Sequence, residues 1–185
     1  AWLAARDVED AFWQALRSRD HNPFNLLVAD TSRSADHGRW WWSDDRSARP
    51  LELGVGIHGL SNAALATPWP KVQRLDRAMA RALAADVNRG SAARLEAALF
   101  DALADRVPVA DDDLPDTGIG RERERWLATA FIRSPDGGYG TRCSTLVIVE
   151  RQAERCTVSV VERSFDRLGG VCGQRAVRGA TWPLA

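Results

Sequence analysis

The stretch Gly56-Ile57-His58-Gly59-Leu60-Ser61-Asn62, followed by Thr67-Pro68-Trp69-Pro70-Lys71, separates two kinds of sequence pattern. Short extended segments precede it and helical periodicity follows it. We expect a strand over Leu51–Leu60 to end in a turn at Ser61 and Asn62, with a helix beginning near Pro70. Because a sheet holds still the side chains at the ends of its strands, Asn62 is the first candidate site residue.

The patterns on either side predict one α+β domain over residues 1–185. Upstream, an amphipathic helix over residues 1–19 precedes an antiparallel meander of three strands. Downstream, three helical segments lead to a final hairpin. The expected strands are Phe24–Asp30, Arg39–Asp44, Leu51–Leu60, Thr141–Glu150 and Cys156–Ser164, and the expected later helices are 71–85, 91–105 and 121–131. The Gly-rich tail from Asp166 receives no assignment. The chain starts with alanine inside a helical pattern, so we expect an upstream segment to be missing.

Composition narrows the class of protein. The chain has 25 basic and 25 acidic residues, so no net field favours nucleic acid or anionic lipid. Its three cysteines, Cys143, Cys156 and Cys172, form no metal-ligand spacing and suit a reducing compartment. We expect no signal peptide, and no apolar run in this sequence is long enough for a membrane span. We therefore expect a soluble cytoplasmic protein without a cofactor.

Few side chains suggest chemistry on their own. The histidines lack zinc-site spacing, and no glycine-rich nucleotide motif opens a helix. For Cys143, a structural thiol is favoured over a nucleophile. For His58, an orienting or core histidine is favoured over a ligand. Trp41 points away from Trp40 and Trp42 on a strand, so it either packs in the core or lines an apolar pocket. Asn62 either caps its turn or donates its amide to a developing oxyanion.

Six segments in order resemble one family. They are Phe24–Asp30, His58–Asn62, Thr67–Val72, Leu114–Gly118, Tyr139–Thr145 and Val161–Phe165. The ordered set is similar to the NRDE family, also called the transport and Golgi organisation protein 2 family. The resemblance implies an αββα sandwich of antiparallel sheets like that of N-terminal-nucleophile hydrolases of the choloylglycine-hydrolase type.

The resemblance also implies which residues form a site. Full-length members begin with a cysteine behind the initiator methionine, followed by an Asn-Arg-Asp-Glu motif, and this sequence contains neither. We therefore expect it to be the later two-thirds of the family domain, completed by a missing N-terminal segment and lacking the nucleophile. Asn62 is similar to the oxyanion-hole asparagine, and Arg125 and Arg142 are candidates to line the site. Any amidohydrolase activity then belongs to the full-length form only.

The alternative is a carrier or trafficking protein that is not an enzyme. The resemblance implies a small-molecule or lipid-like ligand, either haem or an acyl compound such as acyl-CoA, with His58 and Trp41 lining its pocket.

Overall fold

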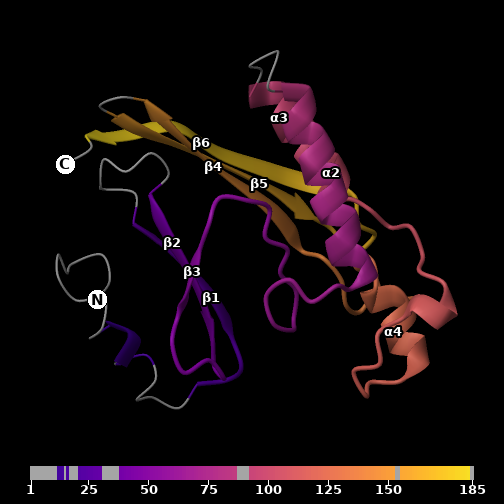
Figure 1. Ribbon diagram of the computed structural model, residues 1–185. Helices are drawn as coiled ribbons and strands as arrows, with labels where there is room; N and C mark the ends of the chain where they lie inside the picture. Colours follow the sequence, from indigo (N-terminus) through magenta and orange to yellow (C-terminus); the bar gives the residue numbers. More distant parts are fainter. Residues whose placement is uncertain are drawn as a thin grey trace. The chain divides into compact units, whose positions relative to one another are not determined.

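The computed structural model describes residues 12–14, 16, 21–30, 38–86, 92–152 and 155–183 (Figure 1). The chain forms two compact units, one of Ala1–Gly56 with Leu184–Ala185 and the other of Ile57–Pro183. The described part of each unit contains one three-stranded antiparallel sheet and helical residues, so the α+β class is confirmed.

The first unit contains the predicted meander. Strands β1 (Asn25–Asp30), β2 (Arg39–Asp44) and β3 (Leu51–Leu53) are hydrogen-bonded in that order, with Asp30 opposite Arg39. Aromatic and β-branched side chains favour a pleated surface, which explains why the run of tryptophans becomes the central strand. The segment expected as a helix over residues 1–19 lies mostly outside the described residues; residues 12–14 and 16 are helical.

The third strand was predicted too long. It ends at Leu53 rather than Leu60, and residues 54–69 contain no strand. Glycine in a strand loses more backbone freedom than other residues and offers no side chain to pack, and Gly54, Gly56 and Gly59 interrupt this segment. Asn62 consequently lies in a loop and not at the end of a strand.

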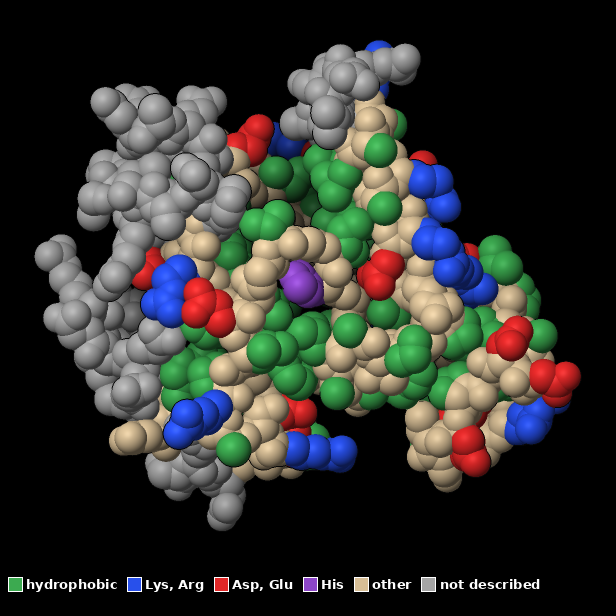
Figure 2. Space-filling model, in the orientation of Figure 1, with side chains coloured by type: hydrophobic (Ala, Val, Ile, Leu, Met, Phe, Trp, Pro, Cys, Tyr) green, Lys and Arg blue, Asp and Glu red, His purple; other side chains and the backbone are tan. Residues whose placement is uncertain are grey.

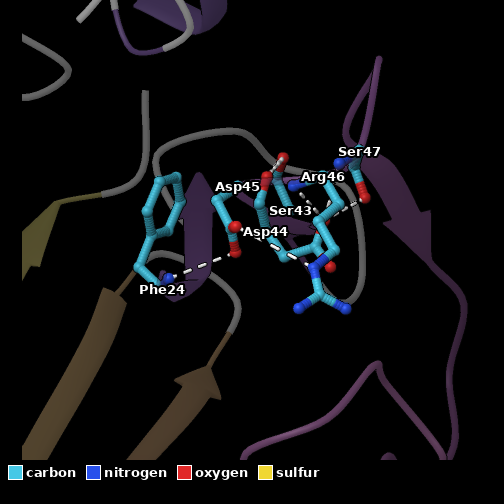
Figure 3. A network of polar contacts seen from close by, with 6 residues as sticks. All are labelled: Phe24, Ser43, Asp44, Asp45, Arg46 and Ser47. Carbon is cyan, nitrogen blue, oxygen red and sulfur yellow. Dashed lines mark hydrogen bonds and ion pairs between the residues drawn. The ribbon is translucent and has the colours of Figure 1, made fainter. Parts of the chain in front are cut away.

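The turn from β2 to β3 is organised by Asp44. Its carboxylate accepts hydrogen bonds from the backbone amides of Arg46 (3.2 Å) and Ser47 (2.7 Å), and from the Ser47 hydroxyl (Figure 3). The hydrogen bond from the Ser47 hydroxyl is the main reason that the pKa of Asp44 lies below its ordinary value. Asp45 accepts from the Phe24 amide at 3.3 Å, which ties this turn to the residue before β1. Such side-chain bonds to nearby amides are the usual way that aspartate stabilises a turn.

The alternation of the three tryptophans places Trp41 in the core of the first unit. Trp41 is 3% exposed and packs with Val28 and Trp13. Trp42 faces the other way, and its indole Nε1 donates to Asn25 Oδ1 at 3.0 Å. The period of two along a strand therefore separates neighbouring indoles onto opposite faces.

The second unit combines helices with a longer sheet. In chain order it contains α2 (Pro70–Asp86), α3 (Ala92–Leu103), the 3₁₀ turn η2 (Asp111–Asp113), α4 (Arg121–Leu127), β4 (Cys143–Gln152), β5 (Arg155–Phe165) and β6 (Val171–Pro183). The predicted helices and hairpin are all present. Helix α4 ends at Leu127, earlier than residue 131, and the β4–β5 connection is shorter than expected.

Strand β6 was not predicted. It pairs along β5, with irregularities between Val158 and Val160 and between Ser164 and Phe165. The sequence signal is weak because the segment contains Gly173 and Gly179 and lacks a clean alternation of apolar and polar residues. Gly179 has a φ of 68°, which allows the bulge. Hydrogen bonds to β5 therefore define this strand more than its own side chains do.

The core of the second unit lies between α3 and the sheet. Phe100 of α3 packs with Leu146 of β4 and Val161 of β5, which oppose each other in register. Helix α2 packs on α3; Figure 2 shows basic side chains along α2, where Arg77 and Arg81 are exposed. This amphipathic arrangement is what the helical period of the apolar residues predicted.

An ion pair holds β6 to α3. Arg178 donates to both carboxylate oxygens of Glu96, at 2.8 and 3.1 Å. The Glu96 side chain is only 11% exposed, and this hydrogen bonding lowers its pKa below the ordinary value of 4.5. A nearby guanidinium, that of Arg163, lies 3.9 Å above the Phe100 ring, so the pair borders the apolar core.

Replacing Glu96 by glutamine is expected to lower the free energy of unfolding by about 1–3 kcal/mol at neutral pH, because a partly buried charge-assisted pair is lost. A carboxylate with a lowered folded pKa contributes stability above its unfolded pKa and loses it as the pH falls through the folded pKa. The difference between wild type and Glu96→Gln should therefore shrink below pH 4.5. Urea denaturation over a pH series measures it, with the exposed Glu150→Gln as control. A pH-independent difference would contradict this assignment.

Candidate functional site

Asn62 lies in a closed loop between β3 and α2. The loop is pinned by the Ala66 amide, which donates to the Gly59 carbonyl at 2.8 Å, and by the Thr67 hydroxyl, which donates to the Ala64 carbonyl at 2.7 Å. Ala66 has a φ of 57°, unusual for a residue with a side chain, so the tight closure carries some backbone strain. Asn62 is exposed, and an asparagine carboxamide has an N–H₂ group that can donate to an anionic oxygen.

Gly59 anchors this loop on α2. A Cβ at Gly59 would lie 2.3 Å from Val72 Cγ1 and within 2.9 Å of both carboxylate oxygens of Asp76. Only glycine permits this close approach of the backbone to the helix. The sequence showed a glycine between two candidate residues, His58 and Asn62; the structure shows that it sets the distance of their loop from α2.

Lys71, the only lysine in the chain, ties the first turn of α2 to α4. Its partly buried Nζ donates to the Leu127 carbonyl at 3.0 Å and lies 5.4 Å from the centre of the Trp69 ring. Burial lowers the pKa of Lys71 below 10.5, and the negative charge of Glu124 opposes that shift. The lysine therefore closes a contact between segments that are far apart in the sequence.

Glu124 is the buried acidic residue whose charge acts on Lys71. It is 5% exposed, and its Oε1 accepts from the Thr117 amide at 2.8 Å and from the Thr117 hydroxyl at 2.6 Å. Lys71 and Glu124 thus connect three segments, which are Thr67–Lys71, Leu114–Gly118 and α4. Sequence reasoning missed both residues; the available signal was a sole lysine directly after two prolines.

Arg125 pairs with Asp111. Its Nε and Nη2 donate to the two carboxylate oxygens at 2.8 and 2.6 Å, and the hydrogen bonds lower the pKa of Asp111. The nearby Arg121 donates to the Asp111 carbonyl at 3.0 Å. Two of the donors of Arg125 are therefore already used to hold η2 against α4.

Arg142 directly precedes β4. Its side chain is exposed, and its carbonyl accepts from the Phe165 amide at 2.9 Å. Across the part of the chain that the structure describes, no ion pair involves Arg142, and no hydrogen bond joins it to Asn62 or Arg125. Cys143, next to it, is an exposed free thiol.

The two predicted pocket residues have different surroundings. His58 is exposed and Trp41 is buried in the core of the first unit, where the Arg39 guanidinium lies 4.6 Å from its ring centre. Within the described ranges, no group of three or more His, Cys, Asp or Glu residues could hold a metal ion. In the same ranges, no helix has the length and apolar character needed to cross a bilayer.

Replacing Gly59 by alanine should lower the free energy of unfolding by about 1–3 kcal/mol, because the added methyl group collides with Val72. Gly54→Ala is the matched control, since no atom lies within 4 Å of a Cβ there, and its change should stay within about 0.5 kcal/mol. Chemical denaturation measures both. Equal effects would mean that the contact between the loop and α2 is not tight in solution.

Lys71 and Glu124 should be energetically coupled. In a double-mutant cycle of Lys71→Met and Glu124→Gln, we expect a coupling of about 0.5–3 kcal/mol, since either single change leaves the other charge partly buried without its counterpart. Equilibrium unfolding of the four proteins gives the value. Strictly additive effects would rule out the pairing.

The sequence is similar to proteins of one family. A family model described as Transport and Golgi organisation 2 matches residues 1–167. The Transport and Golgi organization protein 2 homolog of Bos taurus is 33% identical over 154 residues, which is 78% of this chain and 51% of that protein. The homolog of Homo sapiens is 29% identical over 152 residues, with the same shares. The chain thus spans about half the length of the curated relatives it matches, and it belongs to the Transport and Golgi organisation 2 family.

Proposed function

We propose that this chain carries the oxyanion-binding part of an N-terminal-nucleophile-hydrolase-like protein that cleaves C–N bonds. The nucleophilic cysteine is supplied from outside these 185 residues. The observation that supports the proposal is the placement of Asn62, an exposed carboxamide on a loop that is closed on itself and anchored to α2. Family membership supports it as well, because the ordered motifs include this loop.

In the proposed reaction the thiolate attacks the carbonyl carbon of an amide, after the α-amino group of the same cysteine takes the thiol proton. The carbonyl oxygen then carries negative charge, and the Asn62 N–H₂ donates to it. Collapse breaks the C–N bond, the amine leaves with a proton returned from the α-ammonium group, and water hydrolyses the thioester. Asn62 contributes because a fixed dipole needs no reorganisation as charge develops.

The two arginines have different proposed parts. Arg142 is exposed and takes part in no ion pair within the described chain, which suits it to an anionic group of the substrate. Arg125 already binds Asp111 through two donors, so its proposed part is to line the site while it holds η2 in place.

The αββα sandwich is proposed on the same basis. In such a sandwich, one face of each sheet packs on helices and the other packs on the second sheet. Both faces of each sheet must therefore be apolar. In the first sheet, Leu27 and Leu51 lie opposite Trp42 and are 51% and 52% exposed. In the second sheet, Val147, Val160 and Val177 lie opposite one another, and Val147 and Val177 are each 61% exposed.

The test is turnover in a full-length protein that includes the cysteine. Asn62→Ala should lower kcat by about 10²–10³-fold, the scale for one oxyanion donor, and leave the free energy of unfolding within about 0.5 kcal/mol because the side chain is exposed. Ser61→Ala, one residue away, controls for changes in the loop. An unchanged kcat in Asn62→Ala would remove Asn62 from the mechanism.

The carrier alternative involves the same segment through His58, whose exposed imidazole is of the kind that ligates haem iron. A carrier binds its ligand saturably and does not consume it. A haem titration of the full-length protein, compared with His58→Ala, separates the two functions: a spectral shift that needs His58, without any amide turnover, would favour the carrier.

A further inference from the structure

The turn between β5 and β6 presents an apolar side chain on a backbone that is bonded within itself. Asp166 Oδ1 accepts from the amides of Leu168 and Gly170, each at 2.8 Å. The Asp166 amide donates to the Gly170 carbonyl at 2.9 Å, and the Gly169 amide to the Asp166 carbonyl at 3.0 Å. Leu168 is 71% exposed. The turn therefore fixes Leu168 away from the core.

Two arginines from other segments bind the carbonyls of this turn. Arg106 Nη2 donates to the Gly169 carbonyl at 2.8 Å, and Arg133 Nη1 donates to the Leu168 carbonyl at 3.1 Å. Arg106 is itself held above the Phe131 ring, at 4.1 Å. Backbone groups that are already bonded lose little when water is removed, so this turn is suited to an apolar medium.

Other apolar side chains are exposed on adjoining loops. Val107, directly after Arg106, is 60% exposed, and Tyr139 is 59% exposed. The turn that carries Tyr139 adjoins the β5–β6 turn, because a Cβ at Gly137 would lie 3.7 Å from the Arg167 carbonyl. Val107, Tyr139 and Leu168 are exposed on separate loops. Such an arrangement fits a deformable partner, which can surround each side chain, better than a rigid, concave one.

The charged groups around these tips favour an anionic partner. Arg106, Arg133 and Arg167 are exposed. The nearest carboxylates are those of Asp166 and Asp136, which accept amides of their own turns and keep their negative charge, and that of Asp105, which pairs with Arg74 at 2.8 Å. With the Arg74–Asp105 pair set aside, three arginines face two carboxylates, so this surface carries an excess of one positive charge, while the whole chain carries no net charge.

We propose that this surface, formed by Val107, Tyr139 and Leu168 with Arg106, Arg133 and Arg167, docks on an anionic lipid bilayer. Leu168 enters the boundary between headgroups and acyl chains, Tyr139 lies at headgroup level, and the arginines face the lipid phosphates and carboxylates. The docking is peripheral and does not rest on the proposed hydrolase-like function.

Co-sedimentation with lipid vesicles tests the proposal. The protein should bind vesicles of equal parts phosphatidylcholine and phosphatidylserine, should not bind phosphatidylcholine alone, and should be released by added salt. Leu168→Asp should weaken binding at least about tenfold, the scale for one buried leucine, and Leu168→Ala should weaken it less. Arg167→Glu should also weaken binding, since it inverts one charge at the surface.

The matched controls lie in the first unit. Val55 is 81% exposed and Arg49 is exposed in a turn, so Val55→Asp and Arg49→Glu alter one exposed apolar and one exposed basic residue that are not among the six residues of the surface. Both should bind as wild type does, and unfolding curves should show that all variants are folded. Failure of the wild type to bind anionic vesicles would overturn the proposal, as would unchanged binding by Leu168→Asp or an equal loss in Val55→Asp.

Discussion

The second unit depends on the packing of α3 against the strand pair β4–β5. Phe100 fills the space over Leu146 and Val161, and the remaining parts attach around that contact. Strand β6 has no buried side chain among those described, yet the Glu96–Arg178 pair joins it to α3 beside the same core. A charged pair is effective here because Glu96 is shielded from water while Arg178 remains partly solvated.

The loop with Asn62 is held by contacts of a different kind. Gly59 allows the backbone to touch α2, and the bond between Gly59 and Ala66 closes the loop. In the first turn of α2, Lys71 donates to a carbonyl of α4. In α4, Glu124 accepts from Thr117. A flexible loop would have to lose conformational freedom each time it bound a ligand, whereas an anchored one has lost it on folding. This is the physical basis for treating the loop as a site.

The two proposals concern different parts of the second unit. Asn62 belongs to the loop before α2, and the surface around Leu168 is formed by the segment after α3, the turn before β4 and the turn between β5 and β6. Both share a design in which backbone polar groups are satisfied locally while one side chain is left exposed. Asn62 offers a hydrogen-bond donor, and Leu168 offers an apolar group.

The sequence by itself determined the family, the order of most elements and the alternation of the tryptophans. The family follows from six segments in order. The elements and the alternation depend on local periodicity: apolar residues at helical spacing in 71–85, and side chains alternating along Arg39–Asp44. The early end of β3 also has a local cause, since Gly54 and Gly56 follow its last residue, Leu53.

Tertiary structure alone decided the features that join distant segments. Strand β6 forms because β5 offers it hydrogen-bond partners, and its own glycine-containing pattern does not specify a strand. Lys71 meets Leu127 and Arg106 meets Gly169 because helices and turns bring them together, and no spacing in the sequence encodes those distances. Likewise, Arg125 is one of three arginines in the charged run Arg121–Arg125, and nothing in the sequence distinguishes it from the others. Only the fold brings Asp111 to its guanidinium and leaves Arg142 exposed.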